Sequence, residues 1–590
     1  MRRTQISTLL GLCLFIGLTL FLLRDRSPLG PSKPIDVTPP ELTKILVPST
    51  ESSHPIYQLI TKAEQEFEAV KARQSGSLAK AVEEYRRRYK IPPPPNFDKW
   101  YEFAIGKGVE LIDEYDTIYH SLLPFWALKP PVIRGRAREA LGFDNALLGV
   151  IIRDGAVISA AGGSEWQQKS TVGMVKDFVK YLPDMDLPFN IHDEPRVVVP
   201  NDDLSRLVAL ATDDAMPAAF QNTAPKNAWS PRPADVDDGT RPNEVKFTRF
   251  NQFAHQPTWT NSRMSCAPES PARVLDESIH DNGSLFAFSE LGFLFNKTAF
   301  SDICLSPSLK ERHGFFNRPN AFNIVHDLFP IFSQSKISSY QDILYPSPWY
   351  WSNKVAYDEK DDYSWDKKKN KLYWRGSTTG GFSRDGGWRR QHRQLFVEKI
   401  NALDNTKVMK NVSTTADKAE WKVEEASRTD YKDLMDVKFA HIGQCDPGDC
   451  DAQREFFDVV KPDKQNGAWQ YKYLLDIDGN AFSGRFYAFL KSMSLVYKMA
   501  VFREWHEEWL RPWVHYIPLS LKGDEYVESV RYFNNEPDGQ VQAPKLAKQG
   551  RDWAGKVLRN EDFEVWFFRL LIEYGRLVDD NRENIGYGNV

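Results

Sequence analysis

The most informative stretch of the chain is Tyr373-Trp374-Arg375-Gly376-Ser377-Thr378-Thr379-Gly380-Gly381. An arginine runs directly into a small, hydroxyl-rich and glycine-rich loop. Backbone N–H groups and hydroxyls in such a loop can surround an anion, and a guanidinium offers a planar fork that fits two phosphate oxygens. The stretch therefore predicts a phosphate site at Arg375, Gly376, Ser377 and Thr378. Alternatively, Arg375 is a structural salt-bridge partner. No Gly-Lys-Ser/Thr follows, so this is not a Walker loop.

A second stretch of the same kind is Asp476-Ile477-Asp478-Gly479-Asn480-Ala481-Phe482-Ser483-Gly484-Arg485. It predicts a strand over 472–478, a turn at Gly479 and Asn480, and a helix from about Ser483 to 493. The following strand, 494–501, completes a βαβ unit. Ser483 can cap the helix, whose free N–H groups would then face an anion beside Arg485.

Two alternatives remain open for this second stretch. Arg485 could be a surface arginine paired with Asp478. Asp476 and Asp478 could form a metal-binding Asp-x-Asp pair, since residues two apart on a strand share one face. Two separate phosphate-shaped sites nevertheless indicate a substrate that carries a diphosphate.

The composition limits the class of protein. At 590 residues the chain is too long for one core, so two or more domains are expected. A net charge of −4 gives no basic field, which makes nucleic acid an improbable partner. Aromatic residues make up 13% of the chain, including 17 Trp. Most of these rings are expected in the core, although some could pack on the apolar face of a sugar.

The amino terminus indicates a membrane anchor. An uncharged apolar run covers 6–23, and a helix of that length spans about 27 Å, enough for a thin bilayer. Residues 1–5 carry Arg2 and Arg3 and are expected to stay cytoplasmic. The sequence thus predicts a single-pass type II protein of the Golgi or ER membrane, with 24–590 in the lumen. A cleaved signal peptide is the alternative, but no small-x-small cleavage site follows the run.

Two further features agree with a lumenal location. Three N-glycosylation sequons begin at Asn282, Asn296 and Asn411. Outside the apolar run the cysteines are even in number, as disulfides in an oxidising compartment require: Cys266, Cys304, Cys445 and Cys450. Their order along the chain favours pairing neighbours, but spacing alone does not settle which of the three pairings forms.

The pattern of the remaining chain predicts an α/β protein. A stem and a charged helical segment cover 24–90, and α/β regions are expected over 91–333 and 334–545, with helices over 546–590. Strands are predicted at 146–152, 156–160 and 189–192, and helices at 171–181 and 561–577. The Pro/Asn-rich stretch 213–275 is predicted to be a surface insertion.

The two phosphate-site stretches and Pro512-Trp513-Val514-His515-Tyr516-Ile517-Pro518-Leu519 resemble the capsule-associated-protein group of glycosyltransferase family 90, which is related to the protein O-glucosyltransferases. The resemblance covers most of 85–580, with Gly484 as a mild departure. It implies two Rossmann-like domains facing a cleft (a GT-B fold) and inverting transfer from a UDP-sugar, with Arg375 and Arg485 holding the diphosphate. Neither a metal nor another cofactor is expected. Further sugar or nucleotide contacts are expected from Trp374, Asp478, Asn480 and His515.

Inverting transfer also needs a general base for the acceptor hydroxyl. The segment Asn190-Ile191-His192-Asp193-Glu194-Pro195 resembles the family segment that supplies it, which places the base at Asp193. Pro195 disfavours continuation of the preceding strand, so Asp193 is expected at a strand end. Alternatively, Asp193 caps a turn, a common role for Asp before Glu-Pro.

The sequence therefore predicts transfer of a sugar, with xylose favoured by the resemblance, to a hydroxyl of a mannose-containing glycan or glycolipid. A UDP-glucose-dependent protein O-glucosyltransferase is one alternative. The other is a non-catalytic, membrane-tethered scaffold that binds glycans.

Overall fold

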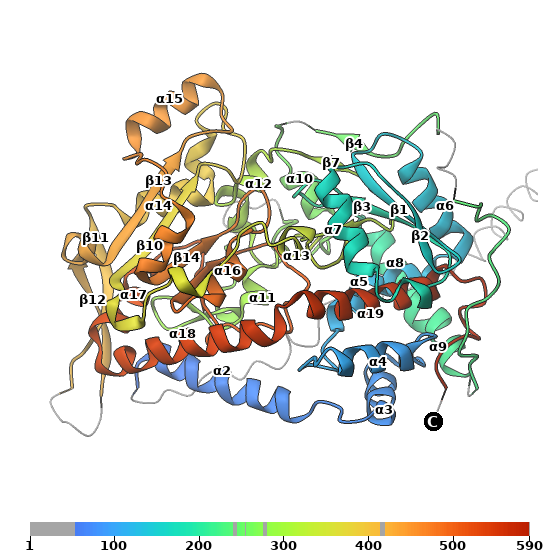
Figure 1. The fold of residues 1–590 in the computed structure, drawn as a ribbon. Coiled ribbons are helices and arrows are strands. Elements are labelled where there is room, and N and C mark those ends of the chain that lie inside the picture. The colour runs from blue at the N-terminus through green and yellow to red at the C-terminus, as the bar shows by residue number, and fades with distance from the viewer. Residues whose placement is uncertain are drawn as a thin grey trace, which may run out of the picture. The chain divides into compact units, whose positions relative to one another are not determined.

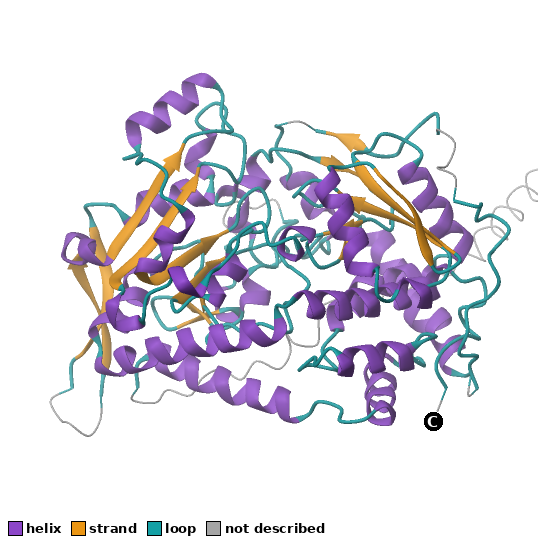
Figure 2. Ribbon diagram, in the orientation of Figure 1, coloured by secondary structure: helices purple, strands orange, loops and turns teal. Residues whose placement is uncertain are grey.

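The computed structural model of the protein describes residues 53–222, 224–239, 245–253, 255–274, 280–413 and 419–588. The predicted cytoplasmic tail, the membrane anchor at 6–23 and most of the stem lie outside these residues. Among the described helices, none has both the length and the apolar character needed to cross a bilayer. The predicted α/β class is confirmed, because helices alternate with strands that form several sheets (Figures 1 and 2).

The C-terminal sheet is parallel throughout. Its order is β13-β10-β14-β15-β16, with the strands β10 (Lys369–Ser377), β13 (Met435–His441), β14 (Tyr471–Ile477), β15 (Leu495–Met499) and β16 (Ile517–Pro518). In chain order this is 2-1-3-4-5, a doubly wound arrangement. The direction of winding reverses between β10 and β14. Ligands of such sheets bind outside the carboxyl ends of the strands at this switch point.

The helices of this region follow its strands, and a hairpin is inserted between β10 and β13. The helices are α14 (His392–Ile400), α15 (Pro447–Phe456), α16 (Phe486–Lys491), α17 (Tyr526–Asn535) and α18 (Pro537–Val557). The hairpin pairs β11 (Asn405–Asn411) with β12 (Trp421–Ser427). Strand β14 is buried along almost its whole length, as expected for a central parallel strand covered on both faces.

The N-terminal sheet is mixed rather than parallel. Its order is β2-β1-β3-β8-β9, with the strands β1 (Leu147–Arg153), β2 (Ala156–Ala161), β3 (Met185–Asn190), β8 (Phe332–Ser333) and β9 (Ile343–Leu344). Strand β1 runs antiparallel to both β2 and β3. The β1–β2 turn is Asp154-Gly155, where both residues have positive φ, as a two-residue hairpin requires. The N-terminal half therefore departs from a parallel Rossmann-like sheet, and β9 extends it beyond the boundary predicted at 333.

Helices enclose this mixed sheet, including one from the far end of the chain. They are α4 (Phe97–Gly106), α5 (Asp116–Leu122), α6 (Pro130–Leu141), α7 (Glu165–Val175), α8 (Asn201–Leu210), α9 (Met216–Phe220) and α19 (Asn560–Val578). Helix α19 contacts α4, α6 and α7, and Phe567 of α19 packs on Phe189 of β3 with ring centroids 6.0 Å apart. The last helix therefore completes the N-terminal core.

Smaller elements complete the described fold. Helices α2 (Pro55–Ala72) and α3 (Leu78–Tyr89) precede the N-terminal sheet. Short helices and two-stranded ladders connect the two sheets: β4 (Asn251–Gln252), α10 (Trp259–Ser262), β5 (Ala287–Phe288), β6 (Phe293–Leu294), α11 (Lys297–Phe300), α12 (Gly314–Asn317), β7 (Asn323–Ile324) and α13 (Pro348–Trp351).

The cysteines form two disulfides, Cys266–Cys304 and Cys445–Cys450. This is the pairing of chain neighbours. Asn282 and Asn411 are exposed, but Asn296 is buried. Its Oδ1 accepts a hydrogen bond from the Ala299 N–H at the start of α11, and its amide nitrogen donates to Leu285 O. A glycan on Asn296 is therefore incompatible with the described conformation, which corrects that prediction.

Candidate active site

The two predicted phosphate-site loops meet at the switch point. The amide of Gly380, beyond β10, donates to Asn480 Oδ1, beyond β14, over 3.1 Å. Arg393 on α14 joins the same loops. Its Nη1 lies 2.6 Å from Thr379 Oγ1, and its Nε lies 2.8 Å from Asp478 O. The carboxyl ends of β10 and β14 thus form one hydrogen-bonded platform.

Arg393 and Arg485 place two guanidiniums at this platform. Neither has an ion-pair partner among the described residues; Arg393 donates to carbonyl and hydroxyl oxygens, and Arg485 Nη1 donates to Arg375 O. Burial lowers the pKa of Arg393 to about 9, with a further contribution from the positive charge of Arg485. Burial also lowers the pKa of Arg485. The buried Asp476 carboxylate partly offsets the lowering of both pKa values. Two desolvated like charges that form no ion pair with a carboxylate nevertheless favour a bound anion.

The Arg375 side chain does not join this pair. Its Nη2 lies 2.7 Å from Asp436 Oδ1 and its Nε lies 3.2 Å from Asp463 Oδ2. The guanidinium also packs over the Tyr373 ring, 4.9 Å from the centroid. Only the Arg375 carbonyl faces the site, where it accepts from Arg485. The structure therefore favours the structural role for the Arg375 side chain, and Arg393 supplies the second guanidinium in its place.

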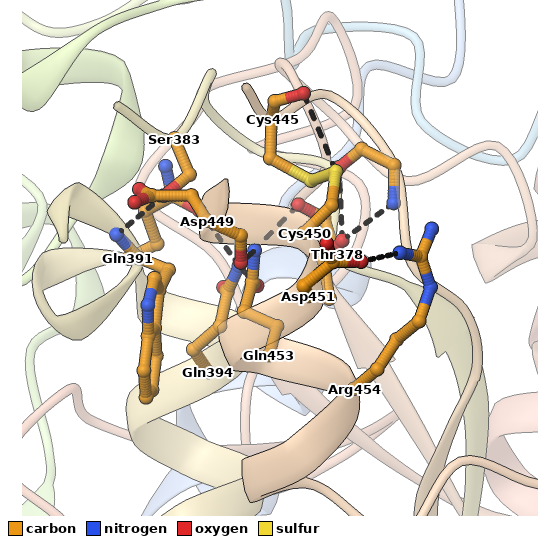
Figure 3. Close-up of a disulfide and its surroundings, with 12 residues drawn as sticks. Thr378, Ser383, Gln391, Gln394, Cys445, Asp449, Cys450, Asp451, Gln453 and Arg454 are labelled. Atoms are coloured by element: carbon orange, nitrogen blue, oxygen red, sulfur yellow. Dashed lines mark hydrogen bonds and ion pairs between the residues drawn. A yellow bond between two sulfur atoms is a disulfide. The ribbon is translucent and has the colours of Figure 1, made fainter. Parts of the chain in front are cut away.

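Hydrogen bonds join Thr378 and Ser383, which flank the glycine-rich loop, to residues next to the Cys445–Cys450 disulfide (Figure 3). Thr378 is buried, and its hydroxyl donates to Gly443 O over 2.9 Å while accepting from the Gly443 N–H. Ser383 Oγ donates to Asp449 Oδ2 over 2.6 Å. Gly443 precedes the Cys445–Cys450 disulfide and Asp449 lies within its loop. Thr378 is therefore a structural residue of the site rather than a phosphate ligand, which corrects its predicted role.

Close approach explains the glycines of the two loops. Gly380 has φ +111°, and a Cβ there would lie 2.6 Å from His392 Cε1. A Cβ on Gly376 would lie 2.4 Å from the Trp374 ring, and one on Gly479 would press against Arg393 at 3.2 Å. These positions need glycine because side chains and α14 support the loops directly beneath them.

The helix after β14 is shorter than the sequence predicts. Helix α16 begins at Phe486 rather than Ser483, and it has six residues. The Ser483 side chain is buried and makes no capping bond; its carbonyl accepts from Tyr350. The helix thus begins three residues later than predicted. The positive charge on this side of the site therefore comes from Arg393 and Arg485 rather than from a helix dipole at Ser483.

Asp476 near the end of β14 and Asp478 just beyond it are both engaged by the protein itself. Asp476 lies 3.2 Å from Lys498 Nζ. Asp478 Oδ2 accepts from the amides of Val501 and Phe502 at 2.7 and 3.1 Å. Both carboxylates are fully buried. Asp478 therefore fixes the loop after β15 and is not placed for the predicted contact with sugar or nucleotide.

Two other predicted contacts also fall in the core. Trp374 is buried beneath Gly376, where Arg393 packs over its ring at 5.7 Å. His515 is buried, accepts from the Arg511 N–H and stacks on Trp553 of α18 at 5.6 Å. Trp374 supports the site from below, whereas His515 belongs to a different packing layer. Both predictions of direct ligand contact are corrected accordingly.

Asp193 lies three residues beyond β3, as an exposed side chain with no hydrogen bond or ion pair to the described residues. Desolvation by the surrounding protein raises its pKa. The side chain is therefore exposed, yet neighbouring protein disfavours its charged form. Its neighbour Glu194 is buried, and its Oε1 accepts from the Ala321 N–H at 2.9 Å. Burial and the charge of Asp193 raise the pKa of Glu194 to about 8.

The Glu194 carboxyl gives the protein a specific pH dependence. Because its pKa rises from 4.5 to about 8 on folding, it stabilises the fold below pH 4.5, and that contribution is lost as pH rises through 8. Thermal unfolding should show that wild-type Tm falls relative to Glu194→Gln between pH 5 and 8. Parallel Tm curves for the two proteins over that range would show that Glu194 is not protonated in the fold.

Two sets of contacts link the Asp193 turn to the phosphate-site loops. The first uses the segment from Gly314 to Ala321. At one end Gly314 packs against Gly381, where an added Cβ would lie 3.0 Å from Gly314 Cα. At the other end the Ala321 N–H donates to the Glu194 carboxylate.

In the second set of contacts, Trp166 of α7 packs edge-to-face on Trp349 of α13 with centroids 5.9 Å apart. Trp349 Nε1 donates to Gly484 O, and Gln167 Nε2 donates to Ile191 O, each at 3.2 Å. A Cβ on Gly484 would lie 2.4 Å from Trp349 Nε1, which explains a glycine before Arg485.

Sequence reasoning missed three residues of this site. Arg393 follows the run Trp388-Arg389-Arg390-Gln391-His392, which contains two further arginines. An arginine this close to the glycine-rich loop is the feature of the sequence that could have indicated its role. Trp166 and Trp349 lie on helices of different regions, and no local pattern indicates that they meet.

Comparison with known proteins shows which family model and which relatives the chain resembles. Residues 316–584 match the model of glycosyl transferase family 90. A protein named O-glucosyltransferase rumi homolog from Aedes aegypti is 28% identical over 272 residues, which cover 42% of this chain and 56% of that protein. Protein O-glucosyltransferase 1 from Rattus norvegicus is 26% identical over 275 residues, covering 43% and 58%. The chain thus spans somewhat more than half the length of these curated relatives.

Proposed function

We propose that the protein transfers a sugar from a UDP-sugar to an acceptor hydroxyl, because residues 316–584 match the model of glycosyl transferase family 90. The observation that carries the proposal is the pair Arg393 and Arg485, two desolvated guanidiniums without a carboxylate partner among the described residues, at the switch point of a parallel sheet. A diphosphate supplies the negative charge that this pair lacks.

In the proposed reaction, UDP leaves with an added negative charge. Arg485, and Arg393 through the loop that it supports, stabilise that charge in the transition state. Asp193 accepts the proton of the acceptor hydroxyl as its oxygen attacks the anomeric carbon from the opposite side, which inverts the configuration. Contacts link the Asp193 turn to the Gly381 loop in one case and to the Gly484 loop in the other, and they support this pairing of roles. The facing arrangement of two α/β halves is proposed to be of the GT-B type.

The donor sugar is proposed to be xylose or glucose. The resemblance to the capsule-associated group favours xylose and a mannose-containing glycan or glycolipid acceptor. The names of the matched relatives, O-glucosyltransferase, favour UDP-glucose and a protein acceptor.

A donor panel tests the function. The purified full-length chain is incubated with UDP-xylose, UDP-glucose, UDP-galactose or UDP-N-acetylglucosamine, and UDP release is measured with and without mannose oligosaccharides. Release from one donor, increased by acceptor, is the expected result. Absence of UDP binding and of release from every donor would contradict the function.

The location is also a proposal. An apolar run at 6–23 supports a type II anchor in the Golgi or ER membrane. Two disulfides support an oxidising lumen around the catalytic region.

A further inference from the structure

A cavity of about 1100 Å³ opens on the side of α14 away from Arg393. Its walls come from 257–274, from 307–312, from α14 and from 521–526. Pockets for small molecules typically hold about 300–1,000 Å³. The cavity is therefore large enough for a ligand of several linked units.

The cavity and the proposed donor site lie on two sides of one helix. Leu395, Glu398 and Lys399 of α14 line the cavity, at the spacing of one helix face. Arg393 points to the phosphate-site loops instead. His392 contributes to both, because it lines the cavity while its Nε2 lies 2.8 Å from Asp478 O. A ligand in the cavity would therefore bind beside the donor loops without occupying them.

Charges of both signs line the cavity in equal number among the described residues. The five cations are Arg263, Lys310, Arg312, Lys399 and Lys522. The five anions are Asp281, Glu311, Glu398, Asp404 and Asp524. The described part of the lining thus carries no net formal charge and favours neither an anion nor a cation.

Most of these charges already interact with the protein. Lys399 Nζ lies 3.0 Å from Asp524 Oδ1, and Lys522 Nζ lies 3.7 Å from Asp281 Oδ2. Arg312 Nη1 donates to Leu521 O at 3.1 Å. A charged ligand would have to displace these partners. Hydroxyl groups, in contrast, can donate to the carboxylates and accept from the cations while the pairs stay intact.

Apolar side chains also line the cavity. They include Trp259, Pro257 and Pro271 from one segment and Leu395 from α14. A lining that combines apolar and hydrogen-bonding groups matches the two kinds of surface on a pyranose ring, whose C–H face packs on aromatic or aliphatic groups and whose edge carries hydroxyls.

From this lining we propose that the cavity binds a neutral oligosaccharide. The site is separate from the proposed donor and proton-transfer residues. The site also gives a role to part of the insertion predicted at 213–275, because residues between 257 and 274 form one wall of the cavity. The Cys266–Cys304 disulfide links this wall covalently to a later part of the chain.

Filling the cavity tests this site. Ala402 is half-buried in the lining, whereas the adjacent Leu403 is 86% exposed and outside it. The purified full-length chain, saturated with UDP, is titrated calorimetrically with mannohexaose, cellohexaose, maltohexaose or hexagalacturonate. At least one neutral hexaose should bind one-to-one. Ala402→Trp should weaken that binding at least about tenfold, and Leu403→Trp should change it less than about twofold.

Several outcomes would overturn the proposal. They are no binding of any neutral hexaose, tighter binding of hexagalacturonate, or equal affinity of wild type and Ala402→Trp. If Ala402→Trp does not fold, Lys310→Trp serves in its place, because it adds bulk to the cavity from the segment 307–312 at a side chain that is largely exposed. UDP affinity should be the same in all variants. Loss of UDP binding in the wild type would instead count against the proposed transferase function.

Discussion

Arg485→Gln is expected to weaken UDP binding by about 10- to 100-fold, because it removes charge-assisted hydrogen bonds worth about 1.5–3 kcal/mol. The guanidinium has no carboxylate partner among the described residues, so phosphate oxygens would be its strongest acceptors. The structure makes a contrasting prediction for Arg375, although the sequence places both arginines on the diphosphate. Isothermal titration with UDP measures the effect directly.

Arg375→Gln is the matched control. It removes ion pairs to Asp436 and Asp463, so it should reduce the free energy of unfolding by about 1–3 kcal/mol. Its effect on UDP affinity should stay below about threefold. If Arg375→Gln abolished UDP binding without lowering Tm, and Arg485→Gln bound UDP normally, the assignment of the two arginines would be reversed.

Asp193→Asn is expected to reduce kcat by about 10²–10⁴-fold, the usual contribution of a general base. Its UDP affinity should be unchanged, because the side chain makes no hydrogen bond or ion pair to the described residues. Because folding raises the pKa of Asp193, its charged form is disfavoured in the fold, and the neutral Asn should give a Tm at neutral pH that is no lower than that of the wild type. Transfer is measured with the donor that the panel identifies and with saturating acceptor.

The same variant separates an enzyme from a scaffold. A rate for Asp193→Asn within about threefold of wild type would remove Asp193 from the proton transfer. Biological activity that persists without transfer would favour the alternative of a membrane-tethered glycan-binding scaffold. Glu194→Gln serves as the control, since it changes the neighbouring buried carboxyl and leaves the exposed one in place.

The local pattern of the C-terminal region was sufficient to predict much of its fold. The run 472–478 became β14, and 494–501 became β15, because long apolar stretches between turn residues favour buried parallel strands. The sequence places Arg375 and Arg485 on one diphosphate, and the loops that follow β10 and β14 do meet, since the carboxyl ends of adjacent parallel strands share one edge.

Side-chain direction was not predictable from the same pattern. The sequence places Arg375 beside a glycine-rich loop, but Asp436 and Asp463, distant in the chain, draw its guanidinium away from that loop. Arg393 takes the position instead. Which of two nearby arginines is paired depends on tertiary neighbours that local sequence does not encode.

The mixed N-terminal sheet shows a related limit. Strands at 146–152 and 156–160 were predicted, and they exist as β1 and β2. Their Asp154-Gly155 turn carried a hairpin signal that makes them antiparallel. Strands β8 and β9 have two residues each, too short for an alternation of apolar residues to be recognised.

An experimental structure of the full-length chain bound to UDP tests the central claim most directly. Both phosphates should lie at the switch point between β10 and β14, within hydrogen-bond distance of Arg485 and above the loops held by Arg393. Arg375 should keep its ion pairs with Asp436 and Asp463. Phosphates bound by the Arg375 side chain, or a UDP seated in the cavity on the other side of α14, would contradict the account.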